Sequence, residues 1–175
     1  RDRVVFSGDL SDCDHVAGEM SGGELIVQGH VGHFLASGMR EGLVSVTGNA
    51  GNYAASSLRG GRVTILGNVG RYAAAASPGA SRGMSGGELL VAGSADQFLA
   101  SRMRRGRVIV LGDVAAGCAS RMIAGTIVVC GGAALPLGYG MARGTLVLVD
   151  AEAHDAVRGW SGFTEADPCE LSFLP

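Results

Sequence analysis

The side chains that could bind a metal ion or transfer protons gather near the start of the chain. His30 and His33 lie in one turn, and earlier stand His15 and three aspartates, Asp9, Asp12 and Asp14. Imidazole nitrogens and carboxylate oxygens are common ligands of transition metals. Related turns further along the chain, however, hold asparagine, aspartate or arginine at the histidine positions. We therefore interpret these histidines as solvated turn residues and assign no metal site.

Four cysteines, Cys13, Cys118, Cys130 and Cys169, raise the question of a nucleophile or a metal ligand. None of them has a second cysteine at CxxC spacing, and the acidic neighbours of Cys13 disfavour the thiolate that nucleophilic chemistry requires. We interpret the cysteines as reduced, small apolar residues of a cytoplasmic protein, and we predict no catalytic residue in this chain.

A 19-residue repeat positions all of these side chains. Seven glycines open short apolar runs at this spacing, apart from one step of 26, and each glycine follows a methionine or leucine by three residues. The pairs are Met20 and Gly23, Met39 and Gly42, Leu58 and Gly61, Met84 and Gly87, Met103 and Gly106, Met122 and Gly125, Met141 and Gly144. The longer step is an insertion near residues 76–82. A fixed period of this kind is typical of a repeat architecture.

Within each unit the second and fourth residues after the glycine are aliphatic, as in Leu25 and Val27, and in six of the seven units a second glycine follows. Period-2 alternation places both columns on one face of a short strand. The sequence predicts an all-β fold, a right-handed single-stranded parallel β-helix of about seven 19-residue coils over residues 1–150. A leucine-rich repeat would require an asparagine ladder and a longer helical return, which we take to be missing. A left-handed hexapeptide helix would require a repeat period of eighteen residues, a multiple of six.

Residues 151–175 leave the repeat but retain Trp160, Phe163 and Leu171. We predict that this tail forms a cap, because an open β-helix end exposes unpaired backbone groups and an apolar core. The net charge of −2 indicates no nucleic-acid partner, and no apolar run approaches the roughly 18 residues of a membrane helix.

A β-helical enzyme that degrades polysaccharide would carry acidic or basic residues at the same outward strand position in adjacent coils. The first position after each opening glycine is mixed: Glu24, Leu43, Arg62, Glu88, Arg107, Thr126 and Thr145. We expect Glu88 and Arg107 to pair across coils as solvated surface residues.

The third and fifth positions become apolar from the fourth coil onward, which is the pattern of a sheet covered on both faces. We predict that another protein chain covers this surface, with the tail contributing. The predicted interface residues are Leu90, Ile109, Leu111, Val128, Cys130, Val147 and Val149.

The repeated turns carry a resemblance to a known family. Gly67-Asn68-Val69-Gly70-Arg71-Tyr72 and Gly83-Met84-Ser85-Gly86-Gly87 resemble the GXGXG-repeat β-helix family. One branch contains the C-terminal domain of the glutamate synthase large subunit and its N-methylglutamate synthase relatives. The other contains the β-helical subunits of formylmethanofuran dehydrogenase and of the bacterial formyltransferase/hydrolase complex. The segment Arg82–Gly87, after the extended coil, is more similar to the second branch, and the first branch remains the alternative.

The resemblance implies a noncatalytic scaffold in one-carbon metabolism that binds no cofactor by itself. It would dock two catalytic chains, one amidohydrolase-like and one formyltransferase-like, which move a formyl group between tetrahydromethanopterin and a methanofuran-type carrier. Arg104 and Arg105 could hold the acidic tail of that carrier, together with Arg82, Arg102 and Arg121 near the same edge. Solvated surface charge is the other interpretation of these arginines.

Overall fold

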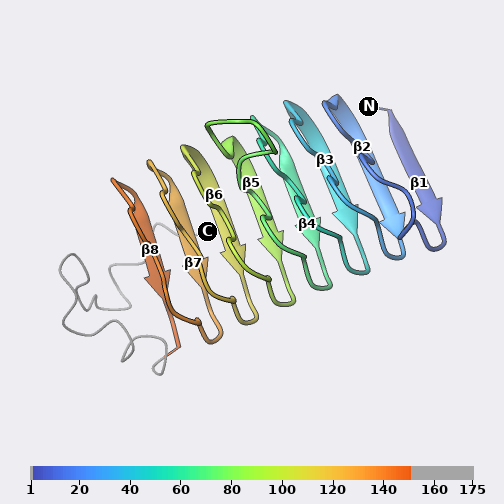
Figure 1. Ribbon diagram of the computed structural model, residues 1–175. Helices are drawn as coiled ribbons and strands as arrows, with labels where there is room; N and C mark the ends of the chain where they lie inside the picture. Colours follow the sequence, from blue (N-terminus) through green and yellow to red (C-terminus); the bar gives the residue numbers. More distant parts are fainter. Residues whose placement is uncertain (1, 151–175) are drawn as a thin grey trace.

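The computed structural model describes residues 2–150. Arg1 and the tail 151–175, with its predicted role as a cap, lie outside the described residues. Eight parallel strands form one sheet in chain order, and the chain winds once around the molecule between successive strands (Figure 1). The predicted parallel β-helix is confirmed. The strands are β1 Arg3–Ser7, β2 Ser21–Gln28, β3 Glu41–Val46, β4 Arg62–Ile65, β5 Ser85–Val91, β6 Arg105–Val110, β7 Thr126–Val129 and β8 Thr145–Leu148.

β1 adds one coil to the seven that the glycines predict. Val4 pairs with Leu25, a step of 21 residues, whereas the following steps are 19 apart from the 26-residue step between Val63 and Leu89. Leu10 pairs with Val31, which is still a step of 21 residues, whereas Asp14 accepts a hydrogen bond from the N–H of His33, which is a step of 19. The two extra residues therefore lie in the corner between Leu10 and Asp14. Because β1 is the first strand of the sheet, the side chain of Phe6 remains 46% exposed although it belongs to an inward column.

The two aliphatic columns fill the inside of the helix, as predicted. Val44, Val63, Leu89 and Val108 are buried, and so are the residues of the second column from Val27 to Val129. Burying one such side chain contributes about 1.5–3 kcal/mol. A third inward column on the opposite side of the coil closes the core with Leu35, Ala54, Ala73, Leu99, Cys118 and Leu137.

The methionine and glycine of each repeat act together across neighbouring coils. Met84 is fully buried, and its Cε atom would lie 2.7 Å from a Cβ atom at Gly106, in the next coil. The same relation joins Met20 to Gly42, Met39 to Gly61, Met103 to Gly125 and Met122 to Gly144. The opening glycines also have positive φ, for example 104° at Gly106. The constant spacing within the repeat therefore has a physical cause: each methionine occupies the space that a side chain on the next coil's glycine would need.

A ladder of polar side chains lies at the corners that follow β2 to β6. Asn49 Oδ1 accepts a hydrogen bond from the backbone N–H of Asn68 (2.8 Å), and Asn68 Oδ1 accepts from Ser94 (2.8 Å). Ser94 and Asp113 continue the ladder toward β7. This is not the uniform asparagine ladder of a leucine-rich repeat, since histidine, asparagine, serine and aspartate follow one another in it. Because no single residue type marks the ladder, the sequence alone does not reveal it.

Replacing Asn68 with alanine is expected to lower the free energy of unfolding by about 1–2 kcal/mol, because the N–H of Ser94 loses its acceptor. Asn68→Ser is the matched control and should cost less than half as much, since Ser94 accepts from the next coil with a hydroxyl. Urea unfolding followed by circular dichroism measures both. Equal losses for the two variants would show that the side-chain volume, and not the hydrogen bond, is important.

The side of the coil opposite the sheet uses left-handed backbone at residues other than glycine. Fifteen non-glycine residues in the described range have positive φ, and they recur at alternate positions, such as Phe34 (59°) and Ala36 (51°). The N–H of Phe34 donates to Asn52 in the next coil, whereas that of Ala36 donates to Val16 in the preceding coil. Hydrogen bonds in both directions offset a cost of roughly 1–2 kcal/mol for each left-handed residue.

Five aromatic rings stack along this same side. His15, Phe34, Tyr53, Tyr72 and Phe98 lie with ring centroids 4.6–5.1 Å apart and interplanar angles of 4–9°. Phe34, Tyr53, Tyr72 and Phe98 occupy the same place in four successive coils, and His15 precedes Phe34 by 19 residues. The stack ends at Phe98, because the equivalent position in the next coil is Gly117, which has no ring.

Candidate docking face and insertion groove

The outward face of the sheet brings the predicted interface residues into two rows. Leu90, Ile109, Val128 and Val147 are register partners on β5 to β8. Leu111, Cys130 and Val149 form the second row at the ends of the last three strands. Leu111 and Val149 are 50% and 58% exposed, whereas Val128 is only 5% exposed. Leu66 extends the second row by adding an exposed apolar side chain at the end of β4.

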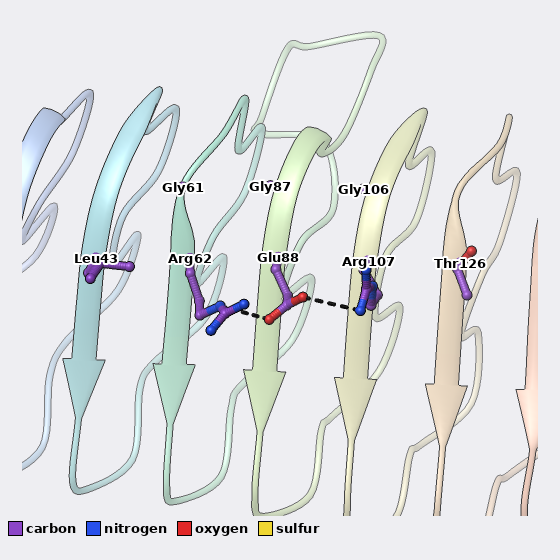
Figure 2. Close-up of a pocket in the computed structure, with 8 residues that line it drawn as sticks. All are labelled: Leu43, Gly61, Arg62, Gly87, Glu88, Gly106, Arg107 and Thr126. Carbon is purple, nitrogen blue, oxygen red and sulfur yellow. Dashed lines mark ion pairs between the residues drawn. The ribbon is translucent and has the colours of Figure 1, made fainter. Parts of the chain in front are cut away.

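A charged rim borders the first row at the strand starts, where a hollow of about 580 Å³ lies over the glycines Gly61, Gly87 and Gly106 (Figure 2). Arg62 Nε lies 2.9 Å from one carboxylate oxygen of Glu88, and Arg107 Nη1 lies 3.6 Å from the other. The predicted pairing of Glu88 with Arg107 is confirmed. Two guanidinium groups share one carboxylate, so the rim has an excess positive charge.

Arg107 is the less exposed of the two arginines, with 34% of its side chain exposed against 59% for Arg62. Its Nη1 atom is shielded from solvent and makes no hydrogen bond, because Glu88 lies 3.6 Å away. Charged rims around apolar centres are the usual anatomy of protein interfaces. The outward face thus combines an apolar centre with a rim that favours an acidic partner surface.

The histidines form part of the structural corners. His30 Nδ1 accepts the N–H of Asn49 and His33 Nδ1 accepts that of Asn52, both at 2.9 Å. The His30 ring therefore begins one polar ladder, and the His33 ring continues a second one, in which the N–H of His33 donates to Asp14 Oδ1. The hydrogen bonds from the Ser11 hydroxyl and backbone N–H lower the pKa of Asp9. Within residues 2–150, no three histidine, cysteine, aspartate or glutamate side chains meet where they could hold a metal ion.

The described cysteines lie in three different environments: Cys13 is exposed, Cys130 half-buried and Cys118 buried. Desolvation raises the pKa of the Cys118 thiol to about 12, and it outweighs the backbone hydrogen bond from Ala119, which lowers the pKa. Cys118 is therefore a protonated core residue in the folded protein.

This raised pKa predicts a pH dependence of stability. Above pH 9.0, the ordinary value for the thiol, Cys118 ionises in the unfolded chain but stays protonated in the folded one up to about pH 12. Its contribution to stability is therefore complete below pH 9 and is lost as the pH rises, by about 1.4 kcal/mol per pH unit. We expect Cys118→Ala to flatten the fall in urea midpoint over this range. Parallel profiles for the two proteins would contradict the prediction.

The five arginines grouped by the sequence occupy three places. Arg104 and Arg105 are exposed at the corner that begins β6. Arg102 and Arg121 line a separate groove of about 480 Å³ beside the insertion, which projects as a loop beside the start of β5 (Figure 1). Arg82 is exposed in the insertion itself. The common edge predicted for them is thus divided among a strand corner, the groove and the insertion.

The insertion is fastened to the rod by hydroxyl groups. Ser77 Oγ lies 3.0 Å from Ser57 Oγ and 3.2 Å from Ser56 Oγ, and the latter lies 3.0 Å from Ser37 Oγ. Arg102 Nη1 also donates to the backbone oxygen of Ala80 at 3.5 Å. Because these contacts fix the loop on both sides of its turn, the groove is a defined feature of the surface.

Within residues 2–150 the chain contains no helix that could span a membrane. No protein-family model matches the chain. A search of curated proteins also finds no match.

The chain is similar in both sequence and fold to a chain of a solved structure. That structure is the X-ray crystal structure of the formyltransferase/hydrolase complex (FhcABCD) from Methylorubrum extorquens in complex with methylofuran. The match has 42% sequence identity and a TM-score of 0.80, and it covers 85% of this chain. The chain spans only about half, 56%, of the length of the matching chain. The resemblance predicted from the repeats is thereby confirmed: this protein is a parallel β-helix similar to a chain of the formyltransferase/hydrolase complex.

Proposed function

We propose that this chain is a noncatalytic scaffold within a formyltransferase/hydrolase complex. The single observation that carries the proposal is the 42% identity to a chain of a multi-subunit complex of this kind. The outward face supports the same role, since its two apolar rows are bordered by a charged rim.

In this proposal the rows from Leu90 to Val147 and from Leu111 to Val149 form the docking surface for the catalytic chains. These would be an amidohydrolase-like chain and a formyltransferase-like chain, acting between tetrahydromethanopterin and a methanofuran-type carrier. Burial of the exposed part of the two rows would provide the apolar centre of a stable interface. We assign Arg104 and Arg105, exposed at the start of β6, to the acidic tail of the carrier.

Affinity purification of the chain from its native source at low salt, followed by mass spectrometry and intact-complex mass measurement, tests the proposal. The expected result is co-purification, in fixed stoichiometry, of an amidohydrolase-like and a formyltransferase-like chain. Recovery of amidotransferase and flavin-containing synthase chains would move the protein to the glutamate synthase branch. Recovery of the chain alone would overturn the scaffold role.

A further inference from the structure

The groove beside the insertion has an unusual composition. It contains all three tyrosines of the chain, Tyr53, Tyr72 and Tyr139, and two arginines, Arg102 and Arg121, but its walls include no acidic residue. Tyr53 and Tyr72 belong to the aromatic stack, so the groove follows the long direction of the rod. It combines aromatic surface with concentrated positive charge.

The positive charge of the groove is not neutralised by the described residues. Arg121 is exposed and forms no ion pair within residues 2–150, and the guanidinium of Arg102 contacts only the backbone oxygen of Ala80. The two residues occupy equivalent positions in adjacent coils, and their backbones are about 4.8 Å apart. Two like charges carried by side chains of adjacent coils repel each other, and a carboxylate that reaches both would relieve the repulsion.

The length of the groove favours an extended chain over a compact molecule. Tyr53 and Tyr139 are separated by four coil steps, which corresponds to about 19 Å. An extended peptide covers this distance with about six residues. Carboxylates at alternate positions of such a peptide would all face the arginines.

We infer that the occupant is the chain's own segment 151–175, which lies outside the described residues. In sequence this segment contains five acids, Glu152, Asp155, Glu165, Asp167 and Glu170, against a single arginine, Arg158. It begins just after β8, whereas Tyr139, at the end of the groove, lies between β7 and β8 in the preceding coil. At about 3.3 Å per residue, its length exceeds that of the groove several times. Glu165 and Asp167 provide carboxylates at alternate positions, and Trp160 and Phe163 provide aromatic groups for the tyrosine wall. This inference does not depend on the proposed scaffold role.

The chain contains its own probe for this contact. Trp160 is the only tryptophan and lies in the segment, while all three tyrosines lie in the groove. Energy transfer from tyrosine to tryptophan falls steeply with distance, so it reports docking in the unlabelled, full-length protein. We expect efficient transfer at low salt and its loss at high salt, because the attraction is electrostatic.

Charge-reversal variants test the assignment. Arg121→Glu should shift the ratio of docked to undocked segment by about tenfold toward the undocked form, seen as lost transfer and greater acrylamide quenching of Trp160. The triple change Glu165→Lys, Asp167→Lys, Glu170→Lys should have a similar effect, and combining it with Arg121→Glu should restore part of the transfer. Arg59→Glu is the matched control, since Arg59 is also exposed but lies outside the groove, and it should have no effect.

Absence of transfer in the free wild-type chain would overturn the inference. So would transfer that is unchanged by Arg121→Glu. If the groove binds the acidic segment of a purified partner while Trp160 remains fully quenchable, the occupant is the partner and not the segment 151–175.

Discussion

Gly106→Ala is expected to lower the free energy of unfolding by about 4 kcal/mol, enough to unfold much of a marginally stable protein. The new Cβ atom would lie 2.7 Å from the backbone oxygen of Gly87 and 2.7 Å from Met84 Cε. Met84 could shift its flexible end, but the Gly87 carbonyl belongs to the neighbouring strand and cannot. The φ of 104° adds backbone strain for any residue with a side chain. Urea unfolding monitored by circular dichroism measures the effect.

Gly79→Ala provides the control for this variant. Gly79 also has a positive φ, 80°, but a Cβ atom there would meet nothing within 4 Å. The substitution therefore adds only the backbone strain and should cost about 1 kcal/mol. If both variants lost the same stability, the close approach of neighbouring coils at the opening glycines would have no energetic importance.

Leu111→Asp is expected to weaken assembly with the partner chains proposed above by about a hundredfold while leaving the β-helix folded. Leu111 is 50% exposed, so the substitution costs the isolated chain little. In the assembled protein the same position would bury an unpaired charge within the apolar centre of the interface. Co-purification from the native source, with the stoichiometry measured by intact mass, records the loss. The thermal unfolding midpoint of the isolated variant confirms that the fold is retained.

Thr47→Asp is the matched control, because Thr47 occupies the same outward row in an earlier coil, where the surface is polar and exposed. It should leave the stoichiometry unchanged. Intact assembly with Leu111→Asp would show that the partners dock elsewhere on the rod.

The repeat made most of the fold predictable, because the information is local in each coil. Gly87 and Met84 mark one coil, and the alternation of Leu89 and Val91 marks its strand and the face that it buries. Each strand has four to eight residues, and it can be predicted from these nearby residues without information from distant parts of the chain. The insertion near residues 76–82 was also visible, as a break in the period.

Features that depend on the register between coils were not predictable in the same way. β1 lacks the methionine and opening glycine, and its longer corner hides the relation between Val4 and Leu25. His15 reads as part of an acidic cluster in sequence, yet it forms the end of the aromatic stack. Val128 is outward-facing but nearly buried, which a count of strand positions does not reveal.

The two-way hydrogen bonding of the left-handed side makes each coil an exchangeable module. Phe34 bonds forward and Ala36 backward in the same register that Tyr53 and Ala55 use one coil later. Gain or loss of a complete 19-residue coil would therefore preserve every column, while a change of any other length must be absorbed in a loop, as at residues 76–82. Genetic duplication can thus lengthen such a rod in steps of one coil, and the reach between its binding surfaces can evolve without redesign of the core.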